Sequence, residues 1–82
     1  MFSPSDQVRV VQLATPAMEH LVVSRARRPP RLGDTGMVVE VREGADDSRH
    51  FLVEAVDGDG ETIWLAEFGA EELQLESEFE SR

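Results

Sequence analysis

Hydrophobic and polar residues alternate with a period of two along much of the chain, the pattern of strands with one buried face. Turn-forming residues separate these stretches at short intervals, and no stretch has the pattern of a long helix. The alternating stretches are QVRVVQL (7–13), MVVEVRE (37–43), RHFLVEAV (49–56), ETIWLAEF (61–68) and LQLE (73–76). We therefore predict an all-β fold, a small barrel or strongly bent sheet of four or five strands.

The connections between these strands are predicted from their turn residues. Residues 44–48 and 57–60 are expected to form hairpin turns, and residues 69–73 a single tight turn. AMEHLVV (17–23) fits one helical turn or the continuation of a strand, and the pattern does not decide between them. The segment 24–32, SRARRPPRL, is expected to be an exposed loop, since its prolines and arginines suit neither a helix nor a central strand.

The stretch RLGDTGMVVEV (31–41) contains the clearest turn and strand of the chain. The turn Gly33-Asp34-Thr35-Gly36 is expected to place at least one glycine at positive φ. It could also form an anion-binding nest of backbone amides, but neither a helix start nor a lysine follows it. We therefore interpret Gly33, Asp34 and Gly36 as structural. In the strand, one face is expected to carry Met37, Val39 and Val41 and the other Val38, Glu40 and Arg42.

Trp64 is the only tryptophan, and two interpretations of it stay open. It shares a strand face with Thr62, Ala66 and Phe68. If that face is buried, Trp64 fills a large part of a small core. If Ile63 and Leu65 face inward instead, Trp64 is exposed and becomes a candidate for contact with a partner.

Charge is distributed unevenly along the chain. The net charge is -9, yet residues 1–31 hold five arginines against two acids, a balance of +3, and residues 32–82 a balance of -12. There is no lysine. An acidic surface of this size repels a phosphate backbone, which argues against nucleic acid as a partner.

Length and composition indicate the number of domains and the compartment of the protein. The 82 residues are expected to form one domain over 1–76, followed by an acidic tail at 77–82. The absence of cysteine suits a reducing compartment, and no leader-like or membrane-spanning apolar run is present. We expect a cytoplasmic protein without contact to a membrane.

Two groups of residues are candidates for metal or acid–base chemistry. Residues 57–61, DGDGE, alternate oxygen ligands as calcium sites do, but Thr62 and Phe68 stand where an EF-hand needs glycine and glutamate. His20 and His50 could pair with Glu19 or Asp47, although no metal-ligand spacing is present. With no cysteine, lysine or tyrosine, most catalytic arrangements are excluded. We expect no enzyme, no metal and no cofactor.

The arginine segment is the sequence feature that stands out, and its candidate binding residues are Arg25, Arg27, Arg28 and Arg31. Arginine forks bind carboxylates and phosphates, and Pro29-Pro30 favours an extended backbone. Three interpretations stay open: an arm that docks on an acidic protein, a contact to RNA, and an arm that lies on the acidic barrel of its own chain or of a second copy.

The pattern of residues 7–75 resembles a family of small, uncharacterised bacterial proteins with an SH3-like barrel. The matching motifs are G-D-x-G-x-V-V-E-V at 33–41, V-D-x-D-G-E-T at 56–62 and A-E-E-L-x-L at 70–75. The turn and strand at 33–41 are also similar to KOW-type domains and to the barrel of the nitrile hydratase β subunit. The resemblance implies a five-stranded, partly open SH3-like barrel with one or two short helical turns. The longer arginine-rich segment at 23–32 departs from the family.

Taken together, the sequence predicts a non-catalytic protein-interaction module that binds a protein partner through the arginine segment and Trp64. Homodimer formation is a further expectation, because an open barrel leaves strand edges unpaired. The alternatives are a KOW-like RNA-binding module and an accessory subunit of an enzyme complex.

Overall fold

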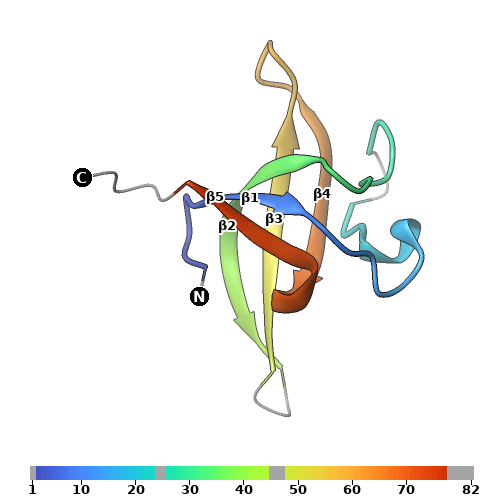
Figure 1. The fold of residues 1–82 in the computed structure, drawn as a ribbon. Helices are drawn as coiled ribbons and strands as arrows, with labels where there is room; N and C mark the ends of the chain where they lie inside the picture. The colour runs from blue at the N-terminus through green and yellow to red at the C-terminus, as the bar shows by residue number, and fades with distance from the viewer. Residues whose placement is uncertain (1, 24–25, 45–47, 78–82) are drawn as a thin grey trace.

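The computed structural model describes residues 2–23, 26–44 and 48–77, and these form five strands and two short 3-10 helices. The strands are β1 (Gln7–Val10), β2 (Thr35–Glu43), β3 (Arg49–Val56), β4 (Thr62–Gly69) and β5 (Leu73–Ser77). The helices are η1 (Ala17–His20) and η2 (Ala70–Glu72). They make one antiparallel sheet in the order β4-β3-β2-β1-β5 (Figure 1). The predicted all-β fold, a five-stranded and partly open barrel with short helical turns, is confirmed.

The core lies inside the bend of this sheet, where β1 and β5 cross over the β3–β4 hairpin (Figure 1). Trp64, Phe51 and Phe68 are its largest side chains, and the ring centroids of Trp64 and Phe68 lie 5.7 Å apart. The remaining members are small or β-branched except Leu73, in keeping with a thin core. They are Val8, Val10, Val38, Val53, Ala55, Ala66 and Leu73.

A bulge in β2 changes which of its residues face the core. Val38 is buried with 1% exposure, whereas Met37 and Val39 are 42% and 40% exposed. The register against β3 shifts between Val38 and Glu40, so that Val41 returns to the core side. An extra residue in one strand breaks the alternation of side chains. The predicted common face of Met37, Val39 and Val41 is therefore wrong.

Strand β1 is shorter than the stretch of seven residues expected. It ends at Val10, and Val8 and Val10 are the two residues that face the core. The amides of Val11 and Gln12 both donate to the carbonyl of Glu72, at 2.8 and 3.3 Å. The chain thus leaves the sheet immediately after Val10 and enters the long β1–β2 connection, residues 11–34.

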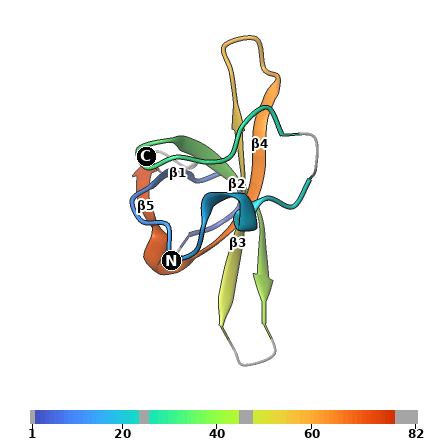
Figure 2. The same ribbon diagram turned by 90° about the vertical axis from the view of Figure 1, so that its right-hand side faces the viewer.

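The β1–β2 connection covers part of the outer edge of β4, and the two run side by side in Figure 2. Leu21 pairs with Ala66, the Val22 amide donates to Leu65 at 3.0 Å, and the Arg27 amide donates to Ile63 at 2.8 Å. Covering an edge strand removes free backbone groups that would otherwise bind other chains. Residues 17–23 thus combine both alternatives, a helical turn at η1 followed by an extended residue, Leu21.

The segment 24–32 is less exposed than predicted. Pro30 is fully buried, and Ala26, Arg28 and Pro29 are half-buried. Residues 24–25 lie outside the described part of the chain, as do the centre of the predicted turn at 44–48 and residues 78–82 of the predicted tail. Within the described ranges, no helix is long and apolar enough to cross a membrane.

Candidate functional site

Arg27 lies against the acidic turn at the tip of the β3–β4 hairpin. Its guanidinium donates to Asp57 at 3.0 Å and approaches Glu61 at 3.6 Å. The pKa of Asp57 is lowered, mainly by the amide of Glu61 and then by Arg27. The Arg27 side chain is still half-exposed, so water screens this pair. The arginine is therefore paired within its own chain.

Asp34 binds three residues, two from the segment 24–32 and one from β4. Its carboxylate accepts hydrogen bonds from the Arg28 guanidinium at 2.8 and 3.2 Å, the Arg31 amide at 2.9 Å and the Trp64 indole at 2.9 Å. Burial raises the pKa of Asp34, but the bonds from Arg28, Trp64 and Arg31 outweigh it and the pKa is lowered. Asp34 therefore ties the arginine segment to the core.

These contacts decide between the interpretations of Trp64. Its side chain is fully buried, and its N–H is bound by Asp34. Ile63 and Leu65, its neighbours on β4, are half-buried. A buried indole needs a hydrogen-bond acceptor, which the turn supplies. Trp64 is thus a core residue, and the prediction that it contacts a partner is wrong.

Arg31 differs from the other described arginines. Arg9, Arg27, Arg28, Arg42 and Arg49 each lie within 4.0 Å of a carboxylate. Within the described part of the chain, no ion pair is found for the exposed side chain of Arg31. Arg25 lies outside the described residues. The structure thus places Arg27 and Arg28 on acids of their own chain and leaves Arg31 at the surface.

The predicted turn at 33–36 ends at Asp34, because Thr35 and Gly36 are the first residues of β2. Gly33 has the expected positive φ, +91°, a backbone conformation that residues with a Cβ rarely adopt. Its amide donates to Val10 at 2.8 Å, and the Asp34 amide donates to Arg31 at 3.0 Å. A Cβ on Gly36 would lie 2.7 Å from the Val53 side chain. Because these amides are already bound, the turn matches the structural interpretation rather than an anion nest.

The acidic turn 57–61 is likewise held by internal bonds. Asp57 accepts the amides of Asp59 and Glu61 at 2.8 and 3.0 Å in addition to Arg27. The carboxylate therefore closes its own hairpin. Among the described residues, no group of three or more histidines and acids is arranged to hold a metal ion.

A buried pair of His20 and Glu72 was not foreseen from the sequence. The His20 ring and the Glu72 carboxylate lie 2.6 Å apart, with side chains 4% and 5% exposed. Glu72 also accepts the amides of Ala14 and Gly69, both at 2.8 Å. Burial raises the pKa of Glu72, but the bonds from Ala14, Gly69 and His20 outweigh it and the pKa is lowered. Glu19, a candidate partner of the histidines, does not supply this contact, and Asp47, the other candidate, lies outside the described residues.

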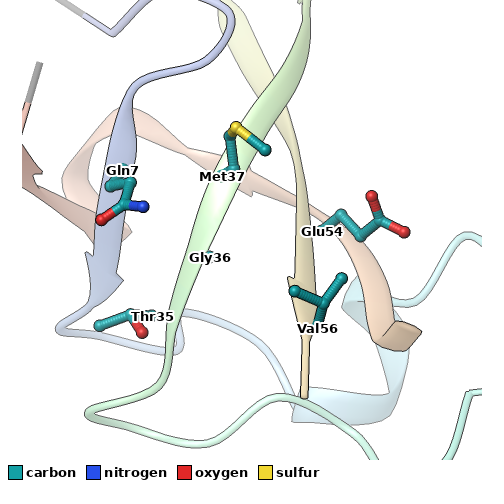
Figure 3. Close-up of a pocket in the computed structure, with 6 residues that line it drawn as sticks. All are labelled: Gln7, Thr35, Gly36, Met37, Glu54 and Val56. Carbon is teal, nitrogen blue, oxygen red and sulfur yellow. The ribbon is translucent and has the colours of Figure 1, made fainter. Parts of the chain in front are cut away.

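A groove crosses the outer face of the sheet on β1, β2 and β3, and we call it the Gly36 groove (Figure 3). Its volume is about 220 Å³, and the pairing of Gln7 with Met37 and of Met37 with Glu54 aligns three of its residues in one row. Val56, which is 50% exposed, is its second large apolar residue. The lining residues are Gln7, Thr35, Gly36, Met37, Glu54 and Val56.

The groove combines apolar side chains with a fixed polar group. Glu54 is held by the hydroxyl of Thr62, which donates to its carboxylate. Met37 is unbranched and adapts to the shape of a neighbour. Because of the bulge in β2, Met37 lies on the outer face and Val41 on the core side, so the sequence pattern placed them on one face wrongly.

A second hollow, of about 350 Å³, lies beside the His20–Glu72 pair. Its titratable lining residues come from η1, β3, β4 and η2. They are Glu19, His20, His50, Glu67, Glu71 and Glu72. His20 and His50 thus border one hollow, although they are 30 positions apart in the sequence.

Comparisons with known proteins returned no match: no family model, no curated protein and no solved structure is similar to this chain.

Proposed function

We propose that the protein is a non-catalytic protein-interaction module that contacts its partner through the Gly36 groove. The observation that carries this proposal is the exposure of Met37 and Val56, 42% and 50%, side by side with polar groups on one sheet face. Protein interfaces combine an apolar centre with a polar rim in this way. In the groove, Gln7, Thr35 and Glu54 form that rim (Figure 3).

The size of the groove supports a protein partner over a small-molecule ligand. Pockets for drug-sized ligands enclose about 300–1,000 Å³ and bury most of the ligand. The Gly36 groove is smaller, at about 220 Å³, and open to solvent along the sheet. A space of this size suits an apolar side chain that projects from a partner, with flanking contacts to the rim.

The arginine segment has a smaller part in this proposal than its composition indicated. Arg28 is bound to Asp34, and Arg27 to Asp57, so a partner that uses either must first displace an internal carboxylate. A partner that binds Arg31 displaces no carboxylate of the described residues, and the neighbouring Leu32 is 63% exposed. We therefore treat Arg31 as a secondary contact.

The proposal is tested by capture of partners from a lysate of the source organism with the tagged chain and matched variants. Met37→Glu and Val56→Glu introduce a charge into the groove. Met18→Glu is the control, since Met18 is 65% exposed and does not line the groove. Circular dichroism and the fluorescence of Trp64 verify that each variant is folded.

We expect the two groove variants to lose a protein that the parent chain and Met18→Glu retain. Retention of every captured protein by both groove variants contradicts the proposal. A loss seen only with Arg31→Glu would assign binding to the arginine segment instead. Capture that disappears after nuclease treatment would favour the RNA-binding alternative.

A further inference from the structure

His20 has a hydrogen-bond acceptor at each of its two ring nitrogens. Nδ1 lies 3.2 Å from the carbonyl oxygen of Pro16, and Nε2 lies 2.6 Å from Oε2 of Glu72. A carbonyl oxygen can only accept, so Nδ1 must carry a proton to bind it. The protonation of Nε2 then depends on the state of Glu72.

The surroundings of Glu72 correspond to an ionised carboxylate. Oε2 accepts the Ala14 amide as well as facing His20, and Oε1 accepts the Gly69 amide. Three donors around two oxygens stabilise the charged form of a carboxyl group. Because an ionised carboxylate has no proton to give, the proton between the two residues belongs to Nε2 and the ring carries two protons.

We infer that His20 is a buried imidazolium that fastens the β1–β2 connection to η2, and that this contact weakens when the ring loses a proton. Neutral histidine keeps one N–H, so one ring nitrogen would then face an acceptor oxygen with a lone pair. Glu72 would at the same time lose the cation that balances its buried charge.

The charged groups that border the hollow beside His20 are mostly acids. The hollow beside the pair is bordered by Glu19 on η1, Glu67 on β4 and Glu71 on η2, and all three are acids. The one titratable base among its other lining residues is His50, on β3. Phe68 packs against the ring from the core, with centroids 5.0 Å apart. Loss of the ring proton would therefore leave the buried Glu72 charge without its cation in mostly acidic surroundings.

The position of the pair gives its protonation a structural consequence. His20 is the last residue of η1, and the next residue, Leu21, pairs with Ala66 on the outer edge of β4. The Ala14 amide, on the other side of η1, is bound by Glu72 itself. Loss of the contact therefore weakens the attachment of η1 beside the Ala14 bond and leaves the β4 edge less covered. This inference does not rest on the proposed function of the groove.

The protonation state can be read directly from two-dimensional ¹H–¹⁵N spectra of the histidine rings in the uniformly labelled parent chain. At about pH 6, near the ordinary titration range of histidine, we expect both nitrogens of His20 to show the shifts of an imidazolium. A ring with a single protonated nitrogen at this pH would overturn the inference, and this result needs no variant to fold.

The effect of the proton on the fold is tested by thermal unfolding at about pH 6 and about pH 8, on either side of neutrality. The His20–Glu72 contact stabilises the fold while the His20 ring is protonated, and this stabilisation is lost as the pH rises. We expect the unfolding midpoint of the parent chain to fall between the two pH values, and that of His20→Gln to fall less. His50→Gln is the matched control and should keep the full decrease. An equal decrease in the parent and in His20→Gln would overturn the inference.

Discussion

Asp34 and Glu72 both hold the β1–β2 connection on the barrel, but they do so with different cations. Asp34 binds Arg28, the Arg31 amide and the Trp64 indole, near the end of the connection. Glu72 binds His20 and the Ala14 amide, which lie in the first half of the connection, and it also binds the Gly69 amide. Each carboxylate thus combines one cationic side chain with N–H groups that need an acceptor.

The difference between the two lies in burial and in the chemistry of the cation. The Glu72 pair is 4% and 5% exposed, whereas the side chains of Arg28 and Asp34 are 28% and 17% exposed. Arginine keeps its charge at every pH that a folded protein tolerates, and histidine does not. The cation at Asp34 therefore keeps its charge across the pH range of the folded protein, whereas the cation at Glu72 can lose its charge.

The largest effect is expected from Glu72→Ala. The substitution leaves a buried imidazolium and the Ala14 and Gly69 amides without their acceptor. Removal of one partner of a buried ion pair costs about 3–5 kcal/mol. Urea unfolding followed by circular dichroism measures the loss. A decrease in the free energy of unfolding below about 1 kcal/mol would show that the pair is not held as described.

Asp34→Ala is expected to cost less than Glu72→Ala. The Trp64 N–H would lose its acceptor, but Arg28 is partly exposed and can turn to water. An unsatisfied buried donor costs about 1–3 kcal/mol. The urea midpoint gives the loss, and the emission of Trp64 reports the change around the indole. Asp34→Asn, which keeps an acceptor oxygen, should recover part of the stability. A larger loss at Asp34 than at Glu72 would reverse the comparison.

Acid should weaken both carboxylate sites. The pKa of Asp34 and that of Glu72 are lowered in the folded protein, so their contribution to stability is present above the ordinary carboxyl pKa and is lost as the pH falls through the folded value. Urea midpoints measured from about pH 6 to about pH 2 span this range. Asp34→Asn should reduce the decrease, and an unchanged decrease in this variant would contradict the role of Asp34.

The smallest effect is expected from Arg27→Ala. The Arg27 pair with Asp57 is exposed and screened, and Asp57 keeps its bonds to the amides of Asp59 and Glu61. We expect no measurable change in the urea midpoint. Arg28→Ala, which removes the cation from Asp34, is the comparison and should lower the midpoint. An equal decrease of the urea midpoint in the two variants would show that the greater burial of Arg28 does not increase its contribution to stability.

The local features of the fold could be predicted from the sequence, and the long-range ones could not. Alternation located the strands, and the run Gly33-Asp34-Thr35-Gly36 located the turn, because both depend on neighbouring residues. The bulge at Val39 depends on the pairing of β2 with β3, so Met37 and Val41 were predicted to share a face that they do not share. No pattern in the sequence marks such a bulge.

The candidate sites show the same division. The sequence identified the arginine segment by composition, but which acid each guanidinium meets depends on how residues 26–34 fold against β4 and its hairpin. His20 and Glu72 are 52 positions apart, and only the tertiary fold brings them together. Glu67, Glu71 and Glu72 are chemically alike and lie close together in the sequence. The sequence therefore contains no signal that identifies Glu72 as the partner of His20.

The most direct test of the comparison between Asp34 and Glu72 is amide hydrogen exchange in the unmodified chain, resolved by residue, at about pH 6 and about pH 8. The Arg31 amide reports on Asp34, and the Ala14 amide reports on Glu72. After correction for the intrinsic effect of pH on exchange, we predict that Ala14 loses protection at the higher pH while Arg31 keeps it. Equal behaviour of the two amides, whether both keep protection or both lose it, would contradict the account.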